Sequence, residues 1–167
     1  MPNVLELKKY PDKILRVKCK PVKKVDDDIR AVLNDMAFTM RAHNGVGLAA
    51  TQVGLDKQLI VVDVGGGLIS MVNPEIIEKK GEDSVEEGCL SLPEITVKIS
   101  RAEEIQVKAL DETGRDIIID AKGLLAIAIQ HEIDHINGIL IIDRVNFIKK
   151  HFFKNKLLKN KKTAKST

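Results

Sequence analysis

The sequence predicts a single α+β domain in which antiparallel β-sheets and hairpins pack around a central buried helix. Two segments, 58–77 and 105–120, each have the pattern of strand, turn and strand, and residues 122–137 have the pattern of a helix that is apolar on nearly every side. The chain has 167 residues, 44% of them apolar, which is enough for one domain to bury a core without disulfides or a structural metal.

The first predicted helix covers residues 26–44. Three aspartates at 26–28 suit the positive end of a helix, and Gly45 supplies its stop. Residues 45–57 are punctuated by glycines and are expected to form a loop. One face of this helix is apolar at helical spacing, through Ile29, Val32, Leu33, Met36 and Met40.

Two hairpins follow. Residues 58–64 (QLIVVDV) predict a strand, three glycines at 65–67 a turn, and residues 68–77 the partner strand. The alternating residues 105–110, the turn DETG and the apolar residues 116–120 predict a second hairpin. The central helix then begins at about residue 122 and carries the apolar run LLAIAI.

Composition excludes several classes of protein. The longest apolar run, Leu124 to Ile129, is far too short to cross a bilayer, and the N-terminus shows no secretory signal. Cys19 and Cys89 are too few for a disulfide framework, so we expect a cytoplasmic location with free thiols. Aromatic residues make up only 3% of the chain, which argues against nucleic-acid binding by base stacking.

The net charge of +3 hides an asymmetry along the chain. Residues 149–167 contain eight lysines and no acidic residue, which leaves 19 basic and 24 acidic residues, a net charge of −5, in residues 1–148. We therefore expect a single domain over 1–148 and a basic C-terminal tail over 149–167. That tail is either a solvated terminus or an electrostatic contact for a polyanion such as RNA.

A metal-binding pattern lies near the end of the central helix, at His131-Glu132-Ile133-Asp134-His135. Histidines four residues apart lie on one helical face, so both imidazoles can bind one metal ion. Glu132 then lies beside a metal-bound water, from which it can take a proton. Two histidines that merely stabilise a core helix are the alternative, but the complete pattern favours a metal.

A third protein ligand is expected, because catalytic metal sites usually have three and one open position. In metzincin proteases it is a histidine at the position that Ile141 occupies here, and in thermolysin-like proteases it is a glutamate well downstream. After His135 the chain contains only Asp143 as an acid and His151 as a histidine, so neither pattern is completed. The third ligand is therefore expected upstream, where Cys89 in E-G-C-L-S carries a thiol and Gly88 allows close backbone approach. The alternative for Cys89 is a small buried hydrophobic residue.

The segment G-V-G-L-A-A-T-Q (45–52) contains glycines at the spacing of a dinucleotide-binding turn. That fingerprint requires a strand before it and a helix after it, whereas here a helix precedes it. We prefer the interpretation that a tight turn directs the amide of Gln52 at an oxyanion.

Taken together, G-V-G-L-A-A-T-Q, E-G-C-L-S and Q-H-E-I-D-H resemble the peptide deformylase family in order and spacing. The resemblance extends to R-A-E-E-I-Q-V-K-A-L-D-E-T-G (101–114) and G-L-L-A-I-A-I (123–129), and covers residues 3–145. It implies that residues 1–148 form a catalytic domain with the deformylase fold. The implied reaction removes the N-formyl group from the initiator methionine of nascent bacterial polypeptides and releases formate.

The resemblance also implies a role for each site residue. Cys89, His131 and His135 would bind one divalent ion, Fe(II) or Zn(II), with Ni(II) and Co(II) left open because this donor set suits all four. Glu132 would act as general base and then general acid. The oxyanion would be stabilised by the amide of Gln52 and the backbone N–H of Leu90.

Substrate contacts are expected around an apolar pocket for the methionine side chain, with Glu87 also orienting a metal ligand through a hydrogen bond. The residues that we assign to substrate binding are Gly45, Val46, Gly47, Val85, Glu87, Gly88, Leu124 and Ile127.

Two other classes of function remain as alternatives. Another H-E-x-x-H metallohydrolase, such as a metallopeptidase, would cleave internal peptide bonds and would not need Cys89. An RNA-binding adaptor would need no metal and would act through the tail.

Many deformylases end in a ribosome-binding helix, and lysines interleaved with Phe152, Phe153, Leu157 and Leu158 would suit such a helix on ribosomal RNA.

Overall fold

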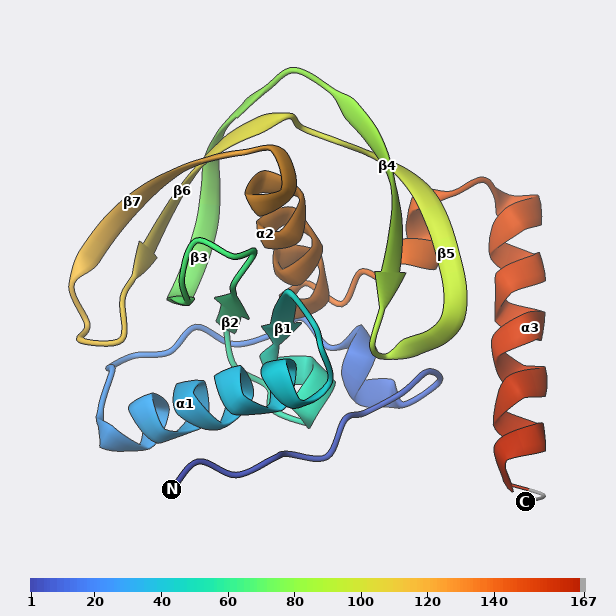
Figure 1. The fold of residues 1–167 in the computed structure, drawn as a ribbon, viewed down its shortest axis with the longest axis horizontal. Helices are drawn as coiled ribbons and strands as arrows, with labels where there is room; N and C mark the ends of the chain where they lie inside the picture. The colour runs from blue at the N-terminus through green and yellow to red at the C-terminus, as the bar shows by residue number, and fades with distance from the viewer. Residues whose placement is uncertain (166–167) are drawn as a thin grey trace.

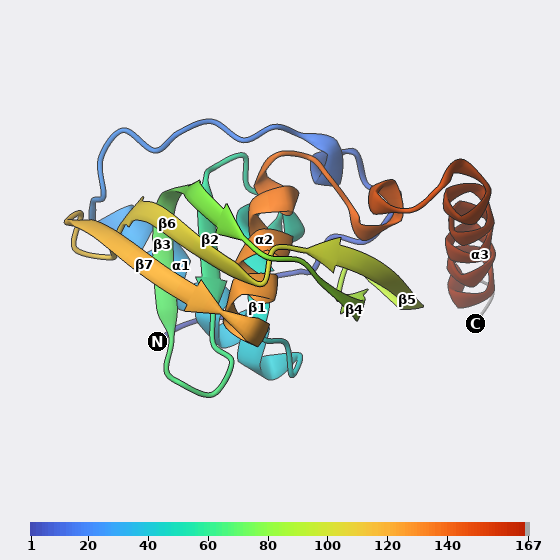
Figure 2. The same ribbon diagram turned by 90° about the horizontal axis from the view of Figure 1, so that it is seen from above.

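Helix α2 (Gly123–Ile136) lies between a five-stranded sheet and a two-stranded sheet in the computed structural model, which describes residues 1–165 (Figure 1). Helix α1 (Asp27–Ala42) lies beside strands β1 (Gly47–Ala49) and β2 (Leu59–Val62) of the larger sheet. Helix α3 (Phe147–Lys165) lies outside the two-stranded sheet, beside β5, in both views (Figures 1 and 2). This arrangement confirms the predicted α+β class with a central buried helix.

The five-stranded sheet is antiparallel throughout, in the order β1-β2-β3-β6-β7. Its two long hairpins are those predicted from the sequence. One joins β2 (Leu59–Val62) to β3 (Ile69–Lys80), and the other joins β6 (Glu104–Leu110) to β7 (Asp116–Lys122). Strand β2 is apolar at every position because both of its faces are covered: Leu59 and Val61 pack with α1, while Ile60 and Val62 pack with α2.

Helix α1 forms as its sequence pattern predicts. The side chain of Asp26 accepts a hydrogen bond of 2.9 Å from the N–H of Ile29 and so caps the first turn. The buried face packs on the sheet through Ile29, Leu33, Met36 and Met40. The helix ends at Ala42, three residues before the glycine-rich segment at 45–47.

The expectation of a plain loop over 45–57 is wrong. This segment contains strand β1 (Gly47–Ala49), which pairs with β2, and a short 3₁₀ helix η2 (Ala50–Val53). The glycines suggested a loop, but the residues that follow Gly47 form regular structure because Leu48, Ala49 and Ala50 are apolar and fully buried. The consequence is that Gln52 lies on a regular element next to α2 rather than on a free loop.

The two-stranded sheet formed by β4 (Asp83–Cys89) and β5 (Leu92–Arg101) has no counterpart in the sequence prediction. Alternate side chains of β5 are buried in a separate cluster together with residues of η3 (Ile141–Arg144). This sheet carries Cys89 at the end of β4, where its side chain lies against His135 of α2.

The basic C-terminal segment is helical, and most of its side chains are exposed to solvent. Helix α3 begins at Phe147, two residues before the expected boundary, and Leu157 is buried with the β5 cluster. Residues 166–167 of the expected tail lie outside the described part of the chain. Among residues 1–165, no helix combines the length and the hydrophobicity that crossing a bilayer requires.

Replacing Gly138 by alanine should destabilise the fold, because this residue ends the turn after α2 with φ of +74° and an added Cβ would lie 2.5 Å from the carbonyl oxygen of Arg16. We expect Gly138→Ala to lower the free energy of unfolding by about 2 kcal/mol or more, as measured by urea denaturation. Gly66→Ala is the control, since its Cβ would meet no atom within 4 Å. Equal unfolding midpoints for the two variants would contradict this account.

Candidate metal centre and active site

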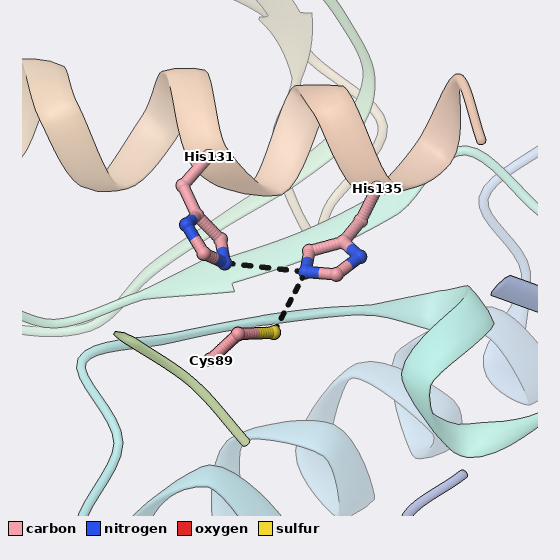
Figure 3. Close-up of side chains that lie close together, drawn as sticks. All are labelled: Cys89, His131 and His135. Carbon is pink, nitrogen blue, oxygen red and sulfur yellow. Dashed lines mark hydrogen bonds between the residues drawn. The ribbon is translucent and has the colours of Figure 1, made fainter. Parts of the chain in front are cut away.

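The structure brings the three predicted ligands together (Figure 3). Sγ of Cys89 lies 3.2 Å from Nε2 of His135, which lies 3.2 Å from Nε2 of His131, and all three atoms are within 4.8 Å of one another. Tetrahedral bonds of about 2.0–2.3 Å hold such donor atoms about 3.3–3.6 Å apart. The two closest separations are near this range, so the donor set fits one divalent ion of the zinc or iron type.

Both elements that supply the ligands direct side chains toward this point. His131 and His135 are one helical turn apart on α2 and therefore share a face. Glu87 and Cys89 are two residues apart on β4, so both side chains point toward α2. The ligand cluster thus depends on the packing of the small sheet against the helix.

Glu87 orients the first histidine. Its Oε1 lies 2.8 Å from Nδ1 of His131. Burial alone would raise the pKa of Glu87, but hydrogen bonds from Arg101 and His131 outweigh it and lower this pKa to about 2. An ionised Glu87 accepts the Nδ1 proton, which leaves the lone pair of Nε2 directed at the other two ligand atoms.

A buried ionic network behind Glu87 was missed by the sequence analysis. Arg101 donates to both oxygens of Glu87, at 2.8 and 2.9 Å, and also to Asp134 at 2.6 Å. Asp134 in turn accepts two hydrogen bonds of 2.6 Å from Arg144. The available signal was the acidic residue within H-E-I-D-H, because a carboxylate on a buried helix requires a cationic partner. Nothing in the sequence identifies Arg101 as that partner.

Glu132 is buried at the edge of the ligand cluster. It is 4% exposed, and its Oε2 is buried without a hydrogen-bond partner. Burial raises the pKa of this carboxyl group to about 7. The side chain lies directly over Gly47, where an added Cβ would be 2.5 Å from Oε1. Only glycine at position 47 leaves room for the carboxylate.

Gln52 also faces the ligand cluster. Its Oε1 accepts a hydrogen bond of 2.9 Å from the N–H of Ala49, which fixes the amide plane. Its Nε2 then points at Sγ of Cys89, 3.6 Å away, and at Oγ of Ser91, 3.3 Å away. A hydrogen-bond donor is therefore held beside the cluster. Leu90 follows Cys89 in the turn between β4 and β5.

A central cavity of about 700 Å³ opens beside these groups. Every site residue predicted from the sequence lines it except His135, which is 1% exposed and lies outside the lining. Lining residues that the sequence analysis did not assign to the site are Asn44, Glu86, Leu92, Glu94, Ile95, Thr96 and Ala128. A thiol, two imidazoles on an H-E-x-x-H helix and a buried carboxylate beside an open cavity define the class of metal-dependent hydrolases.

Comparisons with known proteins identify the family. The family profile of polypeptide deformylase matches residues 4–151, and the chain belongs to this family. A peptide deformylase of Thermodesulfovibrio yellowstonii is 47% identical over 158 residues, covering 92% of this chain and 96% of that protein. One of Carboxydothermus hydrogenoformans is 52% identical over 137 residues, covering 82% and 90%. The family's reaction is the hydrolytic removal of the N-formyl group from nascent peptides, and it depends on a metal.

The fold agrees with this assignment. A crystal structure of a peptide deformylase from Legionella pneumophila matches with a TM-score of 0.92 and 41% identity, over 98% of this chain and 99% of that one. The match extends over almost the whole described chain, so it includes most of α3 as well as the sheets around α2.

Gly47→Ala should reduce catalysis without removing the metal ligands. The added methyl group would push the Glu132 carboxylate from its position, and a displacement of about 1 Å can cost about 100-fold in rate. We expect kcat/KM for formate release to fall about 100-fold while the zinc content after reconstitution stays at the wild-type level. Wild-type kinetics in this variant would show that the position of Glu132 is not critical.

Proposed function

We propose that this chain hydrolyses the formamide bond of formylmethionyl peptides at one metal ion held by Cys89, His131 and His135. The observation that carries the proposal is the convergence of one sulfur and two ring nitrogens beside the unpartnered carboxylate of Glu132. Membership of the deformylase family favours this function over a metallopeptidase that uses the same helix motif.

The side chains divide the reaction between them. A bound divalent ion supplies a Lewis acid and acidifies a water molecule. Glu132 accepts a proton from the attacking water through its free Oε2 and later delivers it to the amine that leaves as the C–N bond breaks. Nε2 of Gln52 and the backbone N–H of Leu90 donate to the oxygen on which negative charge develops.

The metal that we propose is Fe(II) or Zn(II). One thiolate and two imidazoles form a mixed soft and borderline donor set, which these ions accept in tetrahedral geometry. Ni(II) and Co(II) suit the same donors, so the ion present in the cell follows from availability as well as affinity.

The methionine side chain of the substrate is assigned to the apolar part of the central cavity. Val46, Val85, Leu124 and Ile127 line it together with His131. Gly45, Gly47 and Gly88 line the same cavity. Gly88 has open space at its α-carbon, since the nearest atom to an added Cβ would be 3.7 Å away, and this suits close approach of an extended peptide. Glu87 borders the same space and holds His131.

Substitution of Cys89 tests this function directly. Cys89→Ala should lose stoichiometric zinc and most formate release from formyl-Met peptides, because a two-histidine site binds metal weakly. Cys19→Ala is the matched control, since Cys19 is buried in the core and is not one of the three clustered ligand residues, so its variant should keep its zinc. Glu132→Gln should retain zinc but lose at least about 100-fold in kcat. Cleavage of internal peptide bonds, or full activity of Cys89→Ala, would favour the peptidase alternative.

We further infer that α3 binds the ribosome through ribosomal RNA, with residues 1–148 as the catalytic domain. Leu157 faces the body of the protein, while the lysines at 156, 159, 161 and 162 are exposed. Such a charged surface binds a polyanion with little sequence preference. A cytoplasmic location follows from this proposal, because nascent chains and ribosomes are found there.

Charge reversal on α3 should weaken ribosome binding. We expect Lys159→Glu, Lys161→Glu and Lys162→Glu together to lower the fraction that co-sediments with ribosomes at 0.1 M salt by at least about tenfold. The control reverses three exposed lysines elsewhere (Lys23, Lys24 and Lys57), which gives the same net charge. Equal loss in both triple variants would indicate a general charge effect, and unchanged binding in the α3 variant would contradict the proposal.

A further inference from the structure

Asp134 occupies an unusual position on α2. It lies between the two histidines of the metal cluster in sequence, yet its side chain points away from the cluster and toward two arginines. Asp134 is 8% exposed and accepts hydrogen bonds of 2.6 Å from Arg101 and from both Nε and Nη2 of Arg144. These side-chain hydrogen bonds therefore belong to the ionic network, and the reaction proposed above makes no use of them.

The network is a chain of alternating charge that ends on a metal ligand. Arg144 holds Asp134, Asp134 holds Arg101, Arg101 holds both oxygens of Glu87, and Glu87 holds Nδ1 of His131. The side chain of Arg101 is 3% exposed, whereas that of Arg144 is 38% exposed. The ionic network thus extends from the solvent-exposed Arg144, near the start of α3, to the buried ligand His131.

The bidentate contacts limit the freedom of each member. Arg101 donates to Glu87 through one edge of its guanidinium group and to Asp134 through Nη1. The bond to Asp134 therefore fixes the orientation of the guanidinium plane, and with it the position of the Glu87 carboxylate. Without Asp134, Arg101 keeps only one carboxylate partner. Glu87 can then shift, and with it the ring of His131.

We propose that Asp134 and Arg144 are positioning residues for the metal ligand His131, acting through Arg101 and Glu87. The inference rests on the proposed function, because it concerns the same metal site. It assigns a role in the site to the η3 segment, in addition to the packing of Ile141 and Ile142 with β5. Neither residue lines the central cavity or belongs to the ligand cluster.

A neighbouring ion pair provides a matched control. Asp143 lies next to Arg144 on η3 and is bound by Arg16, so it anchors the same segment to the body of the protein. It has no contact with Arg101, Glu87 or His131 among the described residues. Asp143→Asn therefore loosens η3 without breaking the charge chain.

The test compares zinc affinity, measured by competition with a chromogenic chelator, in the full-length protein and its variants. We expect the dissociation constant for zinc to rise about 10-fold in Asp134→Asn and about 3- to 10-fold in Arg144→Gln. Arg144→Lys should have a higher zinc affinity than Arg144→Gln, because lysine restores the positive charge although it lacks the paired donors of the guanidinium group. Asp143→Asn should stay within twofold of the wild type even if its melting temperature falls. The Co(II) absorption spectrum should change in the first two variants alone.

Zinc affinities equal to that of the wild type in Asp134→Asn and Arg144→Gln would overturn the inference, as would an equal loss in Asp143→Asn. If Asp134→Asn does not fold, the more exposed Arg144→Gln decides the question. Failure of the wild-type protein itself to bind zinc and release formate would overturn the proposed function and the inference with it.

Discussion

Helix α2 is buried between two sheets, and five of its last seven residues carry polar side chains (130, 131, 132, 134 and 135). Burying so many polar groups is costly unless each finds a partner. Gln130 satisfies its amide with the backbone of Ala102, and Asp134 is held by two arginines. Two buried polar atoms on α2 side chains lack a partner: Oε2 of Glu132 and Nδ1 of His135. The two sheets supply the apolar contacts and the polar partners that allow this helix to be buried.

The same constraint explains why the site lies where it does. The five-stranded sheet covers one side of α2 with apolar residues, so the polar face must meet the small sheet. There β4 contributes one carboxylate to His131 and one sulfur to the pair of histidines. On the remaining side, β1 brings Gly47 against Glu132 and η2 brings the amide of Gln52. Three separate segments thus converge on one turn of a helix.

Much of the fold and of the ligand cluster could be predicted from the sequence, because the signals for them are local patterns of residue spacing. Helices α1 and α2 and both long hairpins follow from apolar spacing, and the ligands follow from H-E-x-x-H together with E-G-C-L-S. Strand β1 was hidden among glycines. Strand β4 is acidic and has little strand character in its composition. The role of Arg101 could not be predicted, because its partners lie 14 and 33 residues away and no spacing rule links them.

X-ray absorption at the zinc edge of the reconstituted protein tests the central claim most directly, since it counts the atoms around the ion. We expect one sulfur at about 2.3 Å and two imidazole nitrogens at about 2.0–2.1 Å, with a lighter atom completing the shell. A shell without sulfur, or one that is unchanged in Cys89→Ala, would contradict the account.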